Sequence, residues 1–330
     1  MNRSSRLRPA LSVLATGAAL ALPVAASDLA LSVESGGSNT ITVGPGDAVS
    51  WSVVGELSDA SNEGLATIVF DLAFDGGDLT QGDTPAAPPM DNFATPLGLN
   101  NPAGYGGTVV SGDLIQVGGA QNTINNAFAT EPIGNVIPGL AQPGLPETLA
   151  TGTLTAPLDP GTYTLKLDNA LANVIRENET GSPFWAVDGA DIGTVTDLTV
   201  EVVAMTSDVE TVSIAGFGTQ VLSLDAGLAN AGRDYLILGS FTGTDPGITL
   251  GTGVNIPVNF DFYTTLTVDF PNVFVANGLG TLDGNGEATA SFTVFPGTPA
   301  AAAGTILQHA FILLSPKDYA SNAVPLTLVP

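Results

Sequence analysis

The stretch TIVFDLAFDG, which runs from Thr67 to Gly76, decides the fold class. Its large apolar side chains stand at every second position, at Ile68, Phe70, Leu72 and Phe74. A period of two places successive side chains on opposite faces of a β-strand, so that one face is buried and the other is exposed. The Asp-Gly pair at its end is typical of a turn. The stretch therefore predicts a half-buried strand in a layered β protein.

The same alternation recurs along most of the chain. It predicts strands over residues 29–33, 39–43, 49–53, 67–74, 162–167, 194–203, 219–224, 235–241, 264–270, 287–294 and 306–314. Turn-forming residues separate these runs, and none of the runs shows the apolar stripe and caps of a helix. The sequence therefore predicts an all-β fold, with two β-sandwich domains of immunoglobulin-like or jelly-roll type after a cleaved signal peptide.

The first 26 residues have the features of an export signal. Three arginines, Arg3, Arg6 and Arg8, form a positive start. An apolar stretch follows from Leu11 to Leu22, and small residues precede Ser27. No later run reaches the roughly 18 apolar residues of a membrane helix. We therefore predict a signal peptide over residues 1–26 and a secreted protein, extracellular or at the cell surface, with the periplasm as the alternative.

The strand patterns fall into two groups that divide near Ala204. We predict one β-sandwich domain over residues 27–204 and a C-terminal β-sandwich domain over residues 205–330. The chain contains no cysteine, so neither domain can be held by disulfides. Each must therefore depend on its own hydrophobic core.

The charge balance is strongly acidic. The chain has 7 Lys and Arg residues against 32 Asp and Glu residues. Without the three arginines of the signal peptide, four cationic side chains remain and the formal charge is −28. Such a surface repels nucleic acids and anionic lipids, and it attracts divalent cations. We therefore expect an extracellular protein or polysaccharide as the partner, no nucleic acid and no transmembrane segment.

Two resemblances follow from these patterns. The strand from Thr67 to Gly76, together with GTYTLKL from Gly161 to Leu167, resembles cohesin-like modules and their carbohydrate-binding relatives over residues 28–203. Cohesins bind dockerins, so this resemblance implies a protein partner, although no dockerin segment is visible in the chain. The second half, including GTQVLSLD from Gly218 to Asp225, is similar to a module that recurs at the C-termini of large exported bacterial proteins of unassigned role.

The chain contains few side chains of the types that carry out catalysis. His309 is the only histidine, so a zinc site with two histidine or cysteine ligands cannot form. It alternates with Leu307, Phe311 and Leu313, which predicts a buried structural role. Asp71 and Asp75 stand four residues apart on one strand, roughly 13 Å, which exceeds the separation used in glycoside hydrolysis. We therefore predict that the protein is not an enzyme, with a glycoside hydrolase as a remote alternative.

Calcium is the one cofactor that the sequence favours, and no other is required. The candidate ligands are Asp75, Asp78 and Asp83 in one segment and Asp188 and Asp191 in another. Carboxylates in Gly-rich loops suit calcium, but the same residues are also common as solvated turn formers, and both interpretations stay open. A third segment, DGNGE from Asp283 to Glu287, fails the EF-hand pattern, and we interpret it as a hairpin turn at Asn285-Gly286.

A contact surface is expected on the long Pro- and Gly-rich segment from Gln81 to Gly107 and just beyond it. The candidate ligand-binding residues are Phe93, Tyr105, Gln116, Gln121 and Asn122, which combine aromatic rings with amides. We predict a secreted, non-catalytic interaction or structural protein of the cell surface or extracellular matrix. The alternative is a carbohydrate-binding module.

Overall fold

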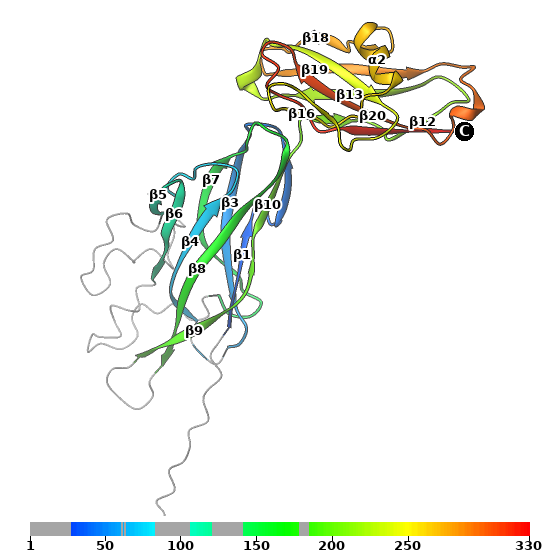
Figure 1. Ribbon diagram of the computed structural model, residues 1–330. Coiled ribbons are helices and arrows are strands. Elements are labelled where there is room, and N and C mark those ends of the chain that lie inside the picture. The colour runs from blue at the N-terminus through cyan, green and yellow to red at the C-terminus, as the bar shows by residue number, and fades with distance from the viewer. Residues whose placement is uncertain (1–27, 61, 63, 83–105, 121–140, 178–184) are drawn as a thin grey trace, which may run out of the picture.

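The computed structural model describes residues 28–60, 62, 64–82, 106–120, 141–177 and 185–330, which form two β-sandwiches in succession (Figure 1). The all-β prediction with two sandwiches is confirmed. The expected signal peptide lies outside the described residues and stays a prediction, as does the domain boundary at residue 204. Within the described part of the chain, no helix is long and apolar enough to cross a membrane.

The N-terminal sandwich contains strands β1 to β10. Their bounds are β1 Asp28–Glu34, β2 Thr40–Val43, β3 Ala48–Leu57, β4 Leu65–Phe74, β5 Gly106–Val110, β6 Asp113–Ala120, β7 Glu147–Thr155, β8 Gly161–Glu177, β9 Trp185–Thr196 and β10 Leu198–Val202. Neighbouring strands follow the order β5-β6-β4-β8-β9-β1-β3-β7, and β10 pairs with both β8 and β2. The first half of β9 pairs with β8 and its second half pairs with β1, so β9 connects the two layers.

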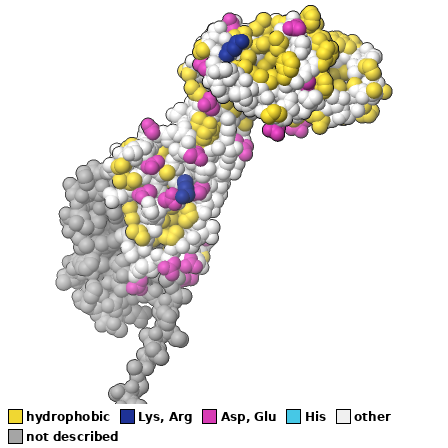
Figure 2. Space-filling model, in the orientation of Figure 1, with side chains coloured by type: hydrophobic (Ala, Val, Ile, Leu, Met, Phe, Trp, Pro, Cys, Tyr) yellow, Lys and Arg dark blue, Asp and Glu magenta, His cyan; other side chains and the backbone are white. Residues whose placement is uncertain are grey.

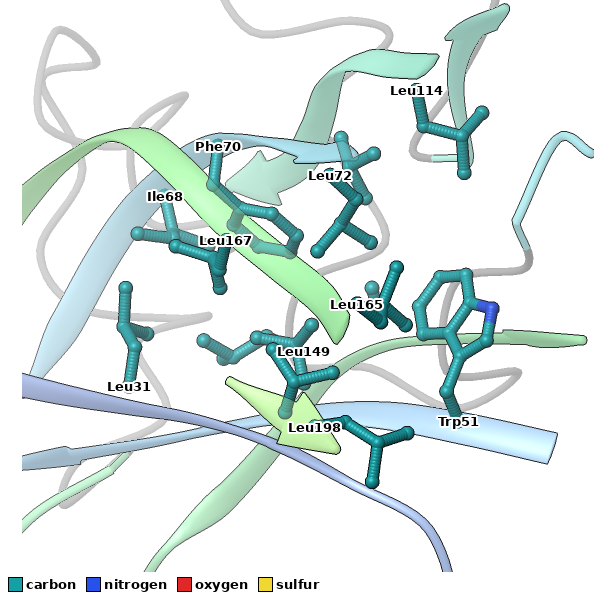
Figure 3. Packing of buried hydrophobic residues seen from close by; sticks show 14 of the residues in the cluster. Leu31, Trp51, Ile68, Phe70, Leu72, Leu114, Leu149, Leu165, Leu167 and Leu198 are labelled. Carbon is teal, nitrogen blue, oxygen red and sulfur yellow. The ribbon is translucent and has the colours of Figure 1, made fainter. Parts of the chain in front are cut away.

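The core of this sandwich lies between β1 and β3 on one side and β4, β8 and β10 on the other (Figure 3). The predicted alternation on β4 is confirmed, because Ile68, Phe70 and Leu72 are at most 1% exposed. Trp51 on β3 is 2% exposed and packs over Gly152 of β7, where a Cβ would overlap the indole. The aromatic side chain therefore requires glycine at this position.

The C-terminal sandwich contains the remaining elements. Their bounds are β11 Met205–Ser207, β12 Thr211–Ser213, β13 Gly218–Asp225, η2 Leu228–Asn230, β14 Asp234–Ser240, β15 Ile248–Thr249, β16 Asn255–Ile256, α2 Phe262–Asp269, β17 Val275–Ala276, β18 Leu279–Thr281, β19 Glu287–Val294, η3 Ala300–Ala302, β20 Ile306–Leu313 and β21 Val324–Val329. The two sheets have the orders β11-β13-β19-β17 and β12-β21-β20-β14-β18, and β15 and β16 form a separate ribbon.

The strand predicted over residues 264–270 is wrong, because this segment forms α2. Asp261 caps the helix: its carboxylate accepts the Thr264 N–H at 3.0 Å, and the Thr264 hydroxyl accepts the Asp261 N–H at 3.1 Å. Such a reciprocal capping box satisfies backbone donors that a helix N-terminus otherwise leaves free. The cap and the tertiary contacts of Tyr263 outweigh the β-propensity of the threonines and valine in this segment.

The hairpin predicted at Asn285-Gly286 is also wrong. A turn does form there, because the Gly286 N–H donates to the Asp283 carbonyl at 3.2 Å. The strands on either side belong to different sheets, however, since β18 pairs with β14 and β19 pairs with β13. The turn therefore connects the two layers of the sandwich.

Candidate interaction face on the N-terminal sandwich

The outer surface of β4, β6 and β8 is the best-defined candidate site, and we call it the β4–β6–β8 face. Because alternate residues of β4 point into the core, Thr67, Val69, Asp71 and Ala73 point outward. β4 lies between β6 and β8 in the sheet, so Asp71 can reach both neighbouring strands. Lys166 and Asp168 point outward from β8 beside it.

Two β-bulges meet beside Asp71. On β8, Asn169 and Ala170 stand opposite Phe70 alone, because Val69 pairs with Leu171 and Asp71 pairs with Asp168. On β6, two residues, Ile115 and Gln116, likewise stand opposite Asp71. Both bulges contain a non-glycine residue with positive φ, which is 53° at Asn169 and 57° at Gln116. Bulges redirect side chains and are enriched next to functional sites.

The carboxylate of Asp71 holds both bulges. One oxygen, Oδ1, accepts the backbone N–H of Gln116 at 2.8 Å. The other, Oδ2, accepts the side-chain N–H of Asn169 at 2.7 Å. A single side chain thus fixes three adjacent strands at the point where the regular ladder is interrupted.

The bulges determine what the face presents to solvent. Without the extra residue on β8, Leu171 would turn into the core, whereas it is 70% exposed. It lies opposite Val69, and the Asn173 amide beyond it donates to the Thr67 hydroxyl at 2.8 Å. Figure 2 shows hydrophobic side chains among acidic ones over β4 and β8. An apolar centre with a fixed polar rim is the usual anatomy of a protein interface.

The structure places one of the five predicted contact residues on this face. Gln116 is exposed, and its backbone N–H binds Asp71. The other four, Phe93, Tyr105, Gln121 and Asn122, lie outside the described residues. That contact surface therefore stays a prediction.

The predicted calcium ligands that the structure describes lie in two segments of the chain. Asp75 and Asp78 are exposed at the end of β4, and the Asp75 carboxylate accepts the Thr164 N–H at 2.7 Å. Asp188 and Asp191 are exposed on β9, whereas Asp83 lies outside the described residues. In the ranges that the structure describes, no three His, Cys, Asp or Glu side chains are grouped so that they could hold a metal ion. Calcium binding stays a prediction.

His309 lies in the core of the C-terminal sandwich, as the alternation on its strand predicts. It is 0% exposed, and its Nε2 lies 2.8 Å from the hydroxyl of Tyr263. Burial lowers the pKa of His309 to about 4, so the imidazole is neutral at neutral pH. No hydrogen-bond partner for its Nδ1 is present in the described part of the chain. A histidine enclosed in this way cannot contact a substrate in solution.

An acidic cleft of about 610 Å³ separates the two sandwiches. Asp47 lines it from the N-terminal side, and Asp225, Asp283 and Glu287 line it from the C-terminal side. Burial raises the pKa of Asp225, and the charges of Asp47 and Asp283 raise this pKa further. Gly44 approaches Asp225 so closely that a Cβ there would overlap the carboxylate.

Sequence reasoning missed Asn169, Leu171 and the role of Asp71 on the β4–β6–β8 face. The available signal was the Asp-Asn pair at residues 168–169, because asparagine tolerates positive φ better than most residues. An extra residue at such a position reverses the alternation of the strand beyond it. The sequence alone therefore does not determine whether a leucine two residues later points into the core or into solvent.

Comparison with known proteins gives structural neighbours only. No protein-family model matches the chain, and no curated protein matches it. The seventh ScaB type I cohesin from Pseudobacteroides cellulosolvens is similar at 14% sequence identity and a TM-score of 0.35, over 53% of this chain and 92% of the cohesin. The type II cohesin dyad from the adaptor ScaA scaffoldin of Acetivibrio cellulolyticus is similar at 13% identity and a TM-score of 0.28, over 87% of this chain and 88% of the dyad. BcpA, the major pilin subunit of Bacillus cereus, is similar at 9% identity and a TM-score of 0.24, over 91% of this chain and 66% of the pilin.

Proposed function

We propose that this protein is a secreted, non-catalytic interaction module of the cell surface or extracellular matrix that binds a protein partner through the β4–β6–β8 face. The observation that carries the proposal is the Asp71 carboxylate. It fixes two bulges, through the Gln116 backbone and the Asn169 amide, and the bulge on β8 turns Leu171 outward. A backbone that is already fixed in this way loses little conformational entropy on binding.

The face suits a protein better than a polysaccharide. Sugar sites usually place an aromatic ring against the sugar, with amides and carboxylates around it. The aromatic side chains described on β4, β6 and β8 are Phe70, Phe74 and Tyr163, and all three pack toward the core. The outward positions instead carry aliphatic, amide and acidic groups, which pair well with a protein surface of mixed character.

The non-catalytic part of the proposal rests on the chemistry that the chain lacks and on what it buries. The sequence has no thiol, and its single imidazole is enclosed beneath Tyr263. The secreted part rests on the signal-like residues 1–26. We further propose residues 27–204 and 205–330 as two folding domains, since separate buried clusters support each sandwich.

The test is capture of proteins and polysaccharides from the organism's own culture by the immobilised mature chain. We expect a protein to be retained, and we expect Leu171→Asp to weaken its affinity by about tenfold or more, because this change places a charge at the centre of the face. Leu228→Asp is the matched control, since Leu228 is a leucine of similar exposure, 73%, on the C-terminal sandwich.

Affinities are measured by biolayer interferometry on the purified partner, and folding is checked by thermal melting. Equal affinity of Leu171→Asp and the native chain would move the contact away from this face. Retention of polysaccharide alone would replace the proposal with the carbohydrate-binding alternative.

A further inference from the structure

Helix α2 packs Tyr263, Leu266 and two threonines against the sandwich and leaves other large apolar side chains exposed. The side chains that it buries are Tyr263, Thr264 and Thr267, which are 7%, 1% and 3% exposed. Phe262 and Val268, by contrast, are 68% and 43% exposed. The outer side of a helix on the surface of a monomeric protein normally carries polar side chains. The outer side of α2 is therefore built as a contact surface.

The segments at both ends of α2 extend this apolar surface. Phe260 is 73% exposed just before the cap, and Phe241 is 46% exposed, with its backbone N–H bonded to the Asp261 carboxylate at 2.8 Å. At the other end, Phe270 is 53% exposed, and the N–H of Val273, which is 69% exposed, donates to the Phe270 carbonyl. We call the following set the α2 patch: Phe241, Phe260, Phe262, Val268, Phe270 and Val273.

Exposed apolar side chains gather in this part of the molecule. Figure 2 shows hydrophobic side chains gathered over the part of the C-terminal sandwich that carries α2. Single exposed apolar residues are normal on soluble proteins, but a connected patch marks an interaction site. Large exposed phenylalanines are also the type of side chain that dominates binding energies at interfaces.

The surface is held rigidly from beneath. The Asp261 carboxylate accepts hydrogen bonds from the Ser240 and Thr242 hydroxyls and from the Phe241 and Thr264 backbone N–H groups. These bonds lower the pKa of Asp261 to about 2, although partial burial opposes them. Tyr263 in turn packs against Gly239 of β14, where a Cβ would overlap its ring. A fixed patch binds without ordering itself first.

Charge decides what the α2 patch can bind. Residues 205–330 contain two cations, Arg233 and Lys317, against ten acids. Arg233 already pairs with Asp318. Asp269 is exposed within the α2 patch, and Asp245 is exposed in the loop that the Asn259 amide holds beside Phe260. This net charge repels a second copy of the chain and an anionic lipid surface, and it attracts a positive partner.

We propose that the α2 patch binds a protein segment whose apolar side chains are bordered by Lys or Arg. The proposal goes beyond the β4–β6–β8 face, since it concerns a second surface on the other sandwich. A chain with both surfaces connects two binding partners, or two parts of one partner.

The test uses the full mature chain and a designed amphipathic peptide of leucine and lysine, with binding measured by isothermal titration calorimetry. Two comparison peptides are a scrambled version, which keeps the charge but disperses the leucines, and a leucine–glutamate version. We expect the leucine–lysine peptide to bind about tenfold more tightly than the scrambled one, and we expect the leucine–glutamate peptide not to bind.

The double variant Phe262→Gln and Phe270→Gln keeps the charge of the chain and removes two exposed rings. We expect it to lose the preference for the amphipathic peptide, whereas Leu228→Gln and Leu171→Asp should bind the peptide as the native chain does. The Leu171→Asp result separates this proposal from the one for the β4–β6–β8 face.

Three outcomes would overturn the proposal once circular dichroism shows that the double variant is folded. Equal binding of the amphipathic and scrambled peptides would show that the peptides bind only through diffuse charge attraction. Dimerisation of the native chain in sedimentation velocity, lost in the double variant, would assign the α2 patch to a second copy. Binding of the native chain to neutral phosphatidylcholine vesicles, also lost in the double variant, would assign it to lipid.

Discussion

Gly118→Val should lower the free energy of unfolding of the N-terminal sandwich by about 4 kcal/mol, at the upper end of single substitutions. Gly118 has a φ of 149°, which side-chain-bearing residues rarely adopt. A Cβ there would overlap the carbonyl oxygen of Ile68 and lie 2.8 Å from the Cα of Val69. Both atoms belong to the backbone of β4, so they cannot move without breaking the ladder between β4 and β6.

Gly189→Val is the matched control. Gly189 also lies in a strand, β9, but it is exposed, and a Cβ there has no neighbour within 4 Å. We expect the control to change stability by about 0.5 kcal/mol or less, because surface substitutions free of strain have small effects. Chemical denaturation followed by circular dichroism measures both variants. Similar losses in the two would show that β4 and β6 are not packed as closely as described.

The pH dependence of stability should carry a contribution of roughly 3 kcal/mol from His309. Burial lowers its pKa to about 4 in the folded state, against an ordinary value of 6.5. The unfolded chain therefore binds the proton more readily between pH 6.5 and pH 4. The stabilisation is complete above pH 6.5 and is lost as the pH falls through this window.

Comparison with His309→Gln isolates this contribution, because the carboxylates titrate alike in both proteins. Glutamine disturbs the contact with Tyr263 by an amount that does not depend on pH in this range. The stability difference between the native chain and the variant should therefore decrease by roughly 3 kcal/mol from pH 7 to pH 4, as measured by urea unfolding at each pH. A difference that stays constant with pH would contradict the burial of this imidazole.

Most strands could be predicted because burial imposes a period of two on them. β4 shows this clearly, since every second side chain from Ile68 to Phe74 is buried. The alternation fails where a local signal competes with it. Residues 264–270 alternate like a strand, but they form a helix. The Asp261 cap and the packing of Tyr263 against Gly239 stabilise this helix. A capping box closed by threonine, and not by the usual Glu or Gln, is difficult to recognise in a sequence.

Strand partners are harder to predict than strands. The turn at Asn285-Gly286 was recognisable, but its flanking strands pair with β14 and β13 in different sheets. An Asn-Gly pair indicates a turn, and it does not determine whether the chain returns to the same layer. Pairing is a tertiary property that depends on which residues each strand meets.

The candidate site was predictable only in part for the same reason. The outward direction of Asp71 follows from the alternation on β4. Its hydrogen bonds to Gln116 and Asn169 require that β6 and β8 both flank β4, and that both have a bulge at the same level. No single stretch of sequence contains this information. The apolar outer side of α2 was missed because the helix itself was not expected.

The packing of Trp51 makes the two halves of the chain optically distinct. The chain has two tryptophans, Trp51 and Trp185, and both precede residue 204. Trp51 is enclosed against Gly152, so its emission will shift to longer wavelengths when water enters the core between the layers. Tryptophan fluorescence therefore follows the N-terminal sandwich alone. Three of the five tyrosines, Tyr235, Tyr263 and Tyr319, lie buried in the other half. A near-ultraviolet change that persists after the tryptophan transition is complete therefore reports on the C-terminal sandwich.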